Sequence, residues 1–325
     1  MTGPILSVRD LVTEIQIRGG KVRPVDGISV EVQRGSIVGL VGESGSGKSM
    51  TAYSILNLFP TKAARVVAGS VILETVDMVT ATEAERESVR GASVGMVFQD
   101  YSVSFNPVIP IGHQLLEQLE THGRRKDGKA KVLSVLEEVG LSQEVYGRYP
   151  HELSGGMLQR VGIASALVCD PDIIIADEPT TALDVTIQAQ ILDLLMRIQK
   201  ERNLSILLIT HDLGIVAEIC NRVYVMYVGN VVEIADVEDL FRDPKHPYTQ
   251  GLLRGATISQ DTSTGGISIP MAGNIPNLRE VPSGCRFHDR CPYAMEICKH
   301  EPPPFFKSDS SDVACWLFQE GLQSE

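Results

Sequence analysis

The stretch GESGSGKS at residues 42–49 constrains the fold of this chain more than any other. It matches the phosphate-binding pattern G-x-x-x-x-G-K-[ST] between an apolar run, Ile37 to Val41, and a predicted helix from Lys48 to Phe59. The glycines let successive backbone N–H groups point at one anion, while Lys48 can reach the β- and γ-phosphates and the Ser49 hydroxyl can bind Mg²⁺. A flexible Gly/Ser turn is the alternative, but the strand and helix around the loop favour a nucleoside triphosphate site.

A second segment, IIIADEP at residues 173–179, supplies the carboxylates that hydrolysis needs. Asp177 is expected to hold Mg²⁺, directly or through water, and Glu178 to polarise the attacking water. Taken alone, the segment could equally be an acidic turn after a core strand. Together with the phosphate loop it predicts hydrolysis of the bound nucleotide.

Three weaker signals narrow the class. Ser154, Gly155 and Gly156 in LSGGM open a predicted helix, so their backbone N–H groups suit an anion, and we expect this to be the nucleotide of a partner subunit. Gln99 in VFQD and His211 in ITHD each follow an apolar strand. A lone Gln or His at a strand end is usually structural, and it is the order of the segments that makes the set specific.

The pattern along the chain predicts an α/β protein. Residues 4–41 indicate a small antiparallel sheet leading into one buried strand, residues 111–147 a helical insert with a break at HGRRKDGK, and residues from 153 on alternating strands and helices of a mainly parallel sheet. After about Val237 the composition shifts to Pro, Gly and Ser. The net charge of −12 argues against broad nucleic-acid binding. No run approaches the roughly 20 apolar residues of a membrane-spanning helix.

In this order the segments resemble the ATPase subunit of ABC transporters, over roughly residues 5–250. The resemblance implies a P-loop ABC ATPase core, with a RecA-like mainly parallel sheet and an antiparallel β subdomain. It also implies a nucleotide-binding domain over 1–237, with its helical subdomain at about 100–155, and a loop-rich C-terminal appendage over 238–325. The family calls the phosphate loop, Gly42–Ser49, the Walker A loop, and it calls the segment LSGGM, Leu153–Met157, the signature. Each ATP would lie between the Walker A loop of one subunit and the signature of the other.

The same resemblance assigns roles to residues of the motifs. It implies catalytic roles for Lys48, Glu178 and His211, and Mg²⁺ contacts for Ser49, Gln99 and Asp177. The nucleotide contacts that it implies, which include the D-loop aspartate of TALD, are Gly42, Ser44, Gly45, Ser46, Gly47, Lys48, Ser49, Met50, Gln99, Ser154, Gly155, Gly156, Asp177 and Asp184.

Longer segments, including FQDYSVSFNPV, YPHELSGGMLQRVGIA and HPYTQGLL, resemble the dipeptide/oligopeptide importer branch, which also contains nickel and some oligosaccharide importers. That resemblance implies a second, non-identical ATPase, two membrane permeases and, indirectly, an extracytoplasmic solute-binding protein, with this chain peripheral on the cytoplasmic face of the membrane. A soluble ABC ATPase acting on nucleic acid or ribosomes is the alternative, which the acidic charge disfavours. A purely regulatory subunit is disfavoured because Glu178 and His211 are present.

Three features depart from the family pattern. Where an aromatic residue commonly stacks on adenine, the stretch LVTEIQIRGG offers Ile15 or Ile17, which forgoes a contribution of about 1 kcal/mol from aromatic stacking. Met50 stands where Thr is common, so only its backbone N–H can serve the α-phosphate. Tyr101, which lies outside the residues that the structure describes, stands where this branch usually has Pro after Gln99. None of these departures removes a catalytic group.

Four cysteines lie near the C-terminus: Cys285, Cys291, Cys298 and Cys315. Zinc sites more often open with cysteines two to four residues apart, and wider spacing is compatible with the four thiolates of a [4Fe–4S] cluster. The resemblance to the importer branch implies such a cluster. A zinc site and two disulfides remain alternatives, although disulfides are uncommon in the cytosol. Cys169 and Cys220 stand alone in predicted helices and are expected to pack in the core.

Overall fold

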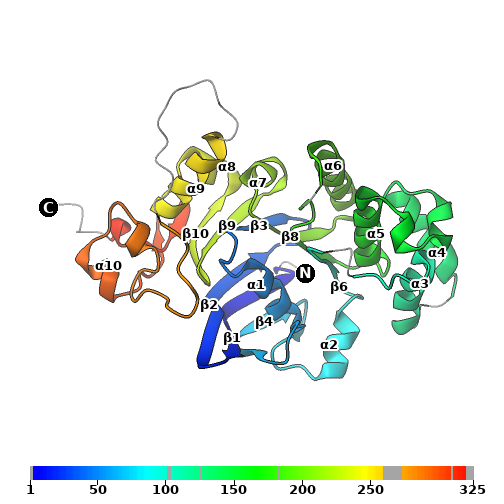
Figure 1. Cartoon of the computed structure of the whole chain (residues 1–325), viewed down its shortest axis with the longest axis horizontal. Coiled ribbons are helices and arrows are strands. Elements are labelled where there is room, and N and C mark those ends of the chain that lie inside the picture. The colour runs from blue at the N-terminus through cyan, green and yellow to red at the C-terminus, as the bar shows by residue number, and fades with distance from the viewer. Residues whose placement is uncertain are drawn as a thin grey trace.

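The computed structural model of the chain describes residues 3–100, 104–124, 126–181, 183–258, 273–308 and 310–319 (Figure 1). Its centre is an eight-stranded sheet with the strand order β11-β12-β10-β9-β3-β8-β7-β6. The strands from β9 to β6 are parallel, and the strands from β10 to β11 are antiparallel. The parallel strands are β3 (Ile37–Val41), β6 (Val94–Val97), β7 (Ile173–Asp177), β8 (Ser205–Thr210) and β9 (Arg222–Tyr227).

The middle strands are apolar because both faces of this sheet are covered. Every residue of β3, β7 and β8 is buried. Alternate side chains belong to different cores: Ile174 packs with the helices α5 (Gly155–Leu167), α6 (Val185–Arg202) and α7 (Leu213–Ile219), whereas Ile173 packs with α1 (Lys48–Leu56) and the smaller sheet. The parallel sheet predicted from the alternating pattern is confirmed.

The smaller sheet is antiparallel, as predicted, and has the order β2-β1-β4-β5. It covers the α1 side of the large sheet, where side chains such as Leu6 and Val71 pack against Ile55 of α1. Its strands are β1 (Leu6–Ile17), β2 (Gly20–Val32), β4 (Ala64–Leu73) and β5 (Val76–Asp77). The short helix α2 (Glu83–Val89) follows β5.

The predicted helical insert consists of α3 (Ile111–Thr121) and α4 (Gly128–Glu138), which pack with α5. The break between α3 and α4 falls in the basic, glycine-containing stretch where the sequence predicts it. No helix in the described ranges combines the length and the apolar character that crossing a bilayer would require.

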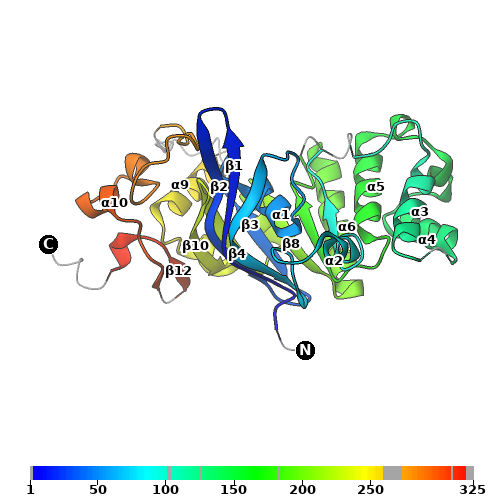
Figure 2. The ribbon, with the colours of Figure 1, turned by 90° about the horizontal axis from the view of Figure 1, so that it is seen from below.

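The segment after residue 237 is joined to the core. β12 (Ser311–Val313) pairs with β10 (Asn230–Asp236), and β11 (Phe306–Lys307) pairs with β12. Tyr248 and Phe287 are buried and pack against Tyr227 of β9, Tyr248 with a tilted ring and Phe287 edge to face. The helices of this segment are α8 (Val237–Arg242), α9 (Pro247–Ile258) and α10 (Glu296–His300). Figures 1 and 2 show α10 and the helical insert at opposite ends of the molecule.

Candidate active site

The phosphate loop connects β3 to α1, and two of its glycines are required by close backbone contacts. A Cβ atom on Gly42 would lie 2.2 Å from the carbonyl oxygen of Met226, and one on Gly47 would lie 2.0 Å from that of Pro24. Gly47 also has a φ of 108°, a left-handed conformation that favours glycine. The loop is therefore pressed against the backbone of neighbouring segments, and only its tip, at Ser44 and Gly45, is exposed.

Lys48 begins α1 and points back into the loop. Its ammonium donates to the carbonyl oxygens of Gly42 at 2.8 Å and Glu43 at 3.1 Å. Burial lowers the pKa of Lys48, while the nearby carboxylates of Glu178 and Asp177 oppose that shift. The loop thus orients the Lys48 side chain, which is predicted to contact the phosphates of the bound nucleotide.

Ser49 and Asp177 meet at the end of β7. The Ser49 hydroxyl donates to Asp177 Oδ1 at 3.0 Å, while the fully buried Asp177 Oδ2 has no hydrogen-bond partner. Burial raises the pKa of Asp177 to about 6. A buried carboxylate oxygen without a partner, beside a hydroxyl, fits the oxygen ligands that Mg²⁺ prefers.

Glu178, the residue after Asp177, has three side-chain hydrogen-bonding partners. Its Oε2 accepts from Gln99 Nε2 at 3.1 Å and from Thr181 Oγ1 at 2.8 Å, and its Oε1 lies 3.1 Å from His211 Nδ1. Burial raises the pKa of Glu178, but the hydrogen bonds from Thr181 and His211 outweigh it, so the carboxyl pKa is lowered. The Glu178 carboxylate is therefore held ionised, as a group that polarises water must be.

The backbone at Glu178 is strained in the way that functional residues often are. Its φ is +48°, and its N–H donates to the carbonyl oxygen of Ile209 on β8 at 2.8 Å. A non-glycine residue in the left-handed region persists only when its surroundings fix it. Here the bond to β8 fixes the backbone turn that follows Asp177.

The structure does not bring the signature residues to this site. Ser154 and Gly155 are exposed at the start of α5, and the Ser154 hydroxyl accepts from the N–H of Met157 as an N-cap. Asp184 is exposed as well, and caps α6 by accepting from the N–H of Ile187 at 3.0 Å. Gly156 packs beside Ile187, where a Cβ would lie 2.9 Å from its side chain.

Two further predicted contacts lie in or beside the loop. Ser46 is buried, and its hydroxyl has no hydrogen-bond partner. Met50 is half-buried in α1 and packs against the core on that side of the sheet, so its side chain has a structural role. Ile15 and Ile17 are half-buried in β1.

Sequence reasoning missed three side chains that support the site. Thr181 donates a hydrogen bond to Glu178, and its position just after the segment IIIADEP could have drawn attention to it. Tyr248 accepts from the N–H of Glu43 at 2.9 Å, and Arg290 pairs with the Glu43 carboxylate. The sequence carries no local signal for these two contacts, because the partners lie 205 and 247 positions apart.

None of the six cysteines, all within the described residues, forms a disulfide, and Cys169 and Cys220 are buried as predicted. In the described ranges no group of three or more His, Cys, Asp or Glu side chains is arranged to hold a metal ion. A preformed metal site among Cys285, Cys291, Cys298 and Cys315 is thus not supported, and the iron–sulfur cluster stays a prediction.

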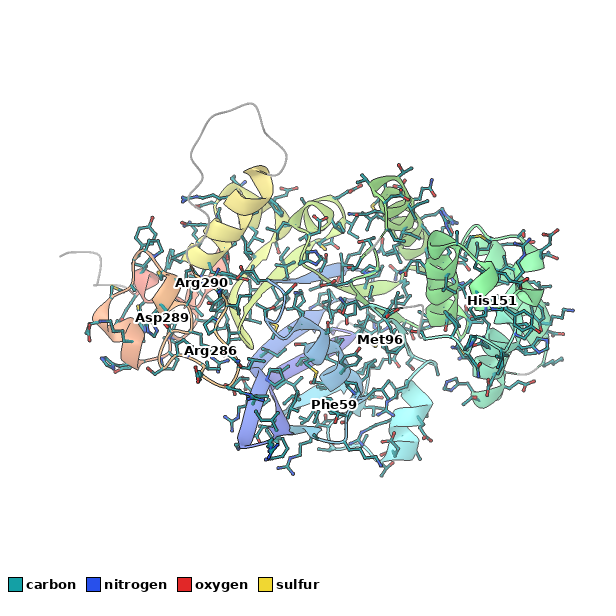
Figure 3. The ribbon with its side chains drawn as sticks, viewed as in Figure 1. Phe59, Met96, His151, Arg286, Asp289 and Arg290 are labelled. Atoms are coloured by element: carbon teal, nitrogen blue, oxygen red, sulfur yellow. The ribbon has the colours of Figure 1, made fainter. Side chains whose placement is uncertain are left out.

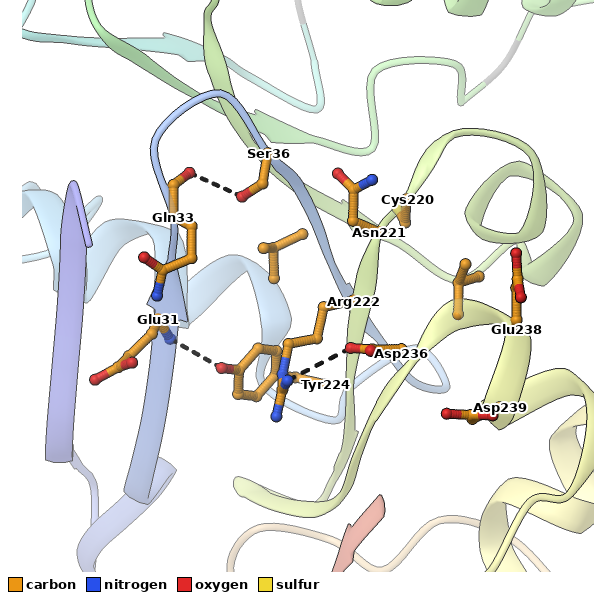
Figure 4. A pocket seen from close by; sticks show the side chains of 12 residues that line it. Glu31, Gln33, Ser36, Cys220, Asn221, Arg222, Tyr224, Asp236, Glu238 and Asp239 are labelled. Atoms are coloured by element: carbon orange, nitrogen blue, oxygen red, sulfur yellow. Dashed lines mark hydrogen bonds and ion pairs between the residues drawn. The ribbon is translucent and has the colours of Figure 1, made fainter. Parts of the chain in front are cut away.

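A cavity of about 710 Å³ opens between β2, β9 and α8, away from these motifs (Figure 4). Arg222 pairs with Asp236 at 3.4 Å beside it, and the Tyr224 hydroxyl accepts from the N–H of Glu31 at 3.1 Å. Its lining includes none of the predicted nucleotide contacts.

Comparisons with known proteins agree with this geometry. The chain matches the family model described as ABC transporter over residues 25–181, and that described as oligopeptide/dipeptide transporter, C-terminal region, over 232–298. It is 44% identical over 318 residues to the dipeptide transport ATP-binding protein DppD of Bacillus subtilis, covering 96% of this chain and 94% of that protein. It is 44% identical over 321 residues to the oligopeptide transport ATP-binding protein AppD of the same organism, covering 97% of each.

Solved structures share the fold. A protein of Clostridium perfringens that is part of an ABC transporter complex superposes with a TM-score of 0.63 at 25% identity, over 74% of this chain and 92% of that one. A dimeric bacterial ABC transporter cassette gives 0.63 at 25% identity, over 71% and 98%. Fold and site together define a P-loop ATPase of the ATP-binding-cassette class. The chain belongs to the ABC transporter family, among its ATP-binding proteins.

Proposed function

We propose that this chain hydrolyses ATP to drive import of dipeptides, oligopeptides or a related solute through a membrane permease. The observation that carries the proposal is the pairing of the candidate site around Ser49, Asp177 and Glu178 with a C-terminal segment that matches the oligopeptide/dipeptide transporter family over residues 232–298. The two relatives named above are peptide-transport proteins, and each matches nearly the whole length of this chain. This favours an importer over a soluble ATPase that acts on nucleic acid or ribosomes.

The residues of the site divide the chemistry among them. The phosphate loop and Lys48 would bind the phosphates, and Ser49 and Asp177 would hold Mg²⁺, which neutralises charge on the phosphates when bound. Glu178 would polarise the attacking water, and Gln99 and His211, both in contact with its carboxylate, would orient it. Water activation would thus depend on Glu178, whereas nucleotide binding would depend on the loop.

The second half of each site would come from another subunit. Ser154, Gly155 and Asp184 are exposed at the starts of two helices. The backbone N–H groups there that the Ser154 and Asp184 side chains do not cap suit an anion. We propose that they face the nucleotide of a non-identical partner ATPase in a sandwich dimer. The dimeric cassette with the same fold gives a precedent for such a pairing.

The helical insert would contact the permeases. A groove of about 340 Å³ lies between β6, α3 and α5, and its lining includes Met96, Phe98 and Phe105 (Figure 3 labels Met96). It lies beside Gln99, so a permease segment seated there could alter the Glu178 contact. The chain would then be peripheral on the cytoplasmic face of the membrane, with two permeases and an extracytoplasmic solute-binding protein completing the importer.

We also propose a [4Fe–4S] cluster held by the four C-terminal cysteines. Burial, with a smaller contribution from repulsion by Cys285, Cys291 and Cys298, raises the pKa of Cys315 to about 12. The N–H of Cys285 donates to the carbonyl oxygen of Cys298 at 2.8 Å. Four thiols that influence one another's ionisation form a donor set of the right kind, since iron binding would stabilise thiolates that burial disfavours. Anaerobically purified protein should contain about four irons per chain; one zinc without iron would refute this assignment.

The decisive test of the ATPase is Glu178→Gln in the complex reconstituted with its permeases and partner ATPase. This variant should bind ATP normally but lose nearly all hydrolysis and peptide uptake. The matched control is Glu218→Gln, an exposed glutamate on α7, which should keep both activities. Hydrolysis at the wild-type rate by the Glu178 variant would contradict the assigned role.

A further inference from the structure

The C-terminal segment contacts the phosphate loop through one buried arginine. Arg290 lies immediately before Cys291, and its guanidinium binds the Glu43 carboxylate through two hydrogen bonds, of 2.9 and 3.2 Å. Only 6% of the Arg290 side chain is exposed. Figure 3 shows Arg290 at the junction between the C-terminal segment and the ATPase core. Paired planar geometry of this kind is both stronger and more directional than a single ion pair.

Aromatic side chains hold this arginine in place. The guanidinium carbon lies 5.7 Å from the ring centre of Tyr227 and 5.8 Å from that of Phe287, both of which are buried. The guanidinium also donates a hydrogen bond to the Tyr227 hydroxyl at 3.4 Å. The arginine is therefore a fixed charge whose position depends on the folding of the C-terminal segment.

Glu43 is held on several sides at once. Its carboxylate binds Arg290, its N–H donates to the Tyr248 hydroxyl at 2.9 Å, and its carbonyl oxygen accepts from Lys48 at 3.1 Å. Two of these three partners belong to the segment after residue 237. The rest of the loop contacts the ATPase core, as at Ser46, whose carbonyl oxygen accepts from the N–H of Gly229 at 2.7 Å.

These contacts have a consequence for ATP binding. A glycine-rich loop loses much conformational freedom when it closes on phosphates, and a loop that is already ordered loses less. We propose that Arg290 is a positioning residue for the ATP site, and that through it the folding of the cysteine-containing loop 285–298 sets the affinity for ATP. This inference rests on the ATP site of the proposed function but not on the transported solute.

Arg286 provides a matched control within the same loop. It also joins the C-terminal segment to the core, by ion pairing with Asp26 and donating to the carbonyl oxygen of Val228. Neither Asp26 nor Val228 lies in the phosphate loop. Arg286→Gln therefore loosens the same junction without touching Glu43.

The experiment measures Mg²⁺–ATP binding by calorimetry on the full chain carrying Glu178→Gln, which prevents turnover. Adding Arg290→Gln should weaken binding about tenfold, the effect of losing one charged hydrogen-bonding partner. Arg290→Lys should recover part of the loss, and Arg286→Gln should stay within about twofold of the parent. If Arg290→Gln stays within twofold, or if both glutamine variants weaken binding equally, the proposal is wrong.

Glu43→Gln keeps the test available if Arg290→Gln does not fold, because it weakens the same pair from the ATPase core. Glu43→Gln alone should then weaken ATP binding about tenfold, and an affinity within twofold of the parent would contradict the proposal. Where Arg290→Gln does fold, adding it to Glu43→Gln should cost little more than either change alone; full additivity would contradict a shared mechanism. Failure of peptide uptake with these binding results intact would refute the transport function and leave the Arg290 inference standing.

Discussion

Asp177→Asn tests whether the predicted magnesium ligand is a strained, buried carboxylate. The change removes the charge and keeps the shape, and the Asn carbonyl oxygen can still accept the Ser49 hydroxyl that now donates to Asp177 Oδ1. Asp177 is fully buried, and Oδ2 has no hydrogen-bond partner. In protein free of nucleotide and metal, we expect the substitution to stabilise the fold at neutral pH.

The size of this stabilisation follows from the pKa of Asp177. Burial raises the pKa of Asp177 from 3.8 to about 6, and each unit corresponds to about 1.4 kcal/mol. The folded state keeps its proton up to about pH 6, whereas the unfolded state loses it near pH 4, so the stability of the wild type falls as pH rises through this window. Above the window the ionised carboxylate costs up to about 3 kcal/mol. The Asn amide, which would be left unpaired, offsets about 1–2 kcal/mol of the gain at every pH.

The assay is urea unfolding of both proteins in EDTA between pH 4.5 and 8. The free energy of unfolding of the variant, relative to wild type, should rise by about 2 kcal/mol across this range and level off above pH 6. The control Asp193→Asn removes an exposed carboxylate of α6 and should show no such rise. With Mg²⁺ and ATP present, the wild type should become the more stable of the two proteins, because only the wild type gains stability from the metal. A flat difference across pH would refute the reasoning.

Further predictions concern the loop, the base and assembly. Gly47→Ala should reduce ATP binding at least tenfold by calorimetry, since a Cβ would lie 2.0 Å from the carbonyl oxygen of Pro24. Thr181→Val should raise the pKa of Glu178 and move the acid limb of the pH–kcat profile upward, with a roughly tenfold lower kcat at neutral pH, as expected for the loss of a hydrogen bond to a charged group. The isolated chain should show low ATPase activity that rises with the partner ATPase and permeases; full activity in a dilute monomer would exclude the sandwich. Cys315→Ser should lower both the thermal midpoint and the iron content.

The sequence predicts which side chains meet at the candidate site because they come from local segments at the ends of strands. Parallel strands end at one edge of a sheet, so Ser49 beside β3, Asp177 at the end of β7 and His211 after β8 converge once the strands are identified. The alternation of strands and helices predicts the layers for the same reason. Both inferences depend on short-range periodicity, which the sequence contains.

The same reasoning could not find contacts made between distant segments. Arg290 and Glu43 are 247 positions apart, and each alone is an ordinary charged residue near a turn. The composition after Val237 indicates loops, yet β12 continues the large sheet and Tyr248 enters its core. Three residues of strand and one buried ring are too short a signal for periodicity to detect.

The pairing of β12 with β10 also bears on the solubility of the chain. Without residues 306–313, the large sheet would lose β11 and β12 and keep six strands, with β10 at its edge. The unpaired backbone groups of β10 would then be open to another molecule. β12 covers this edge, and β11, only two residues long, ends the sheet with little surface to pair. A chain cut at residue 237 should therefore aggregate through β10 even where its ATP site is intact, so the C-terminal segment protects the ATPase from self-association.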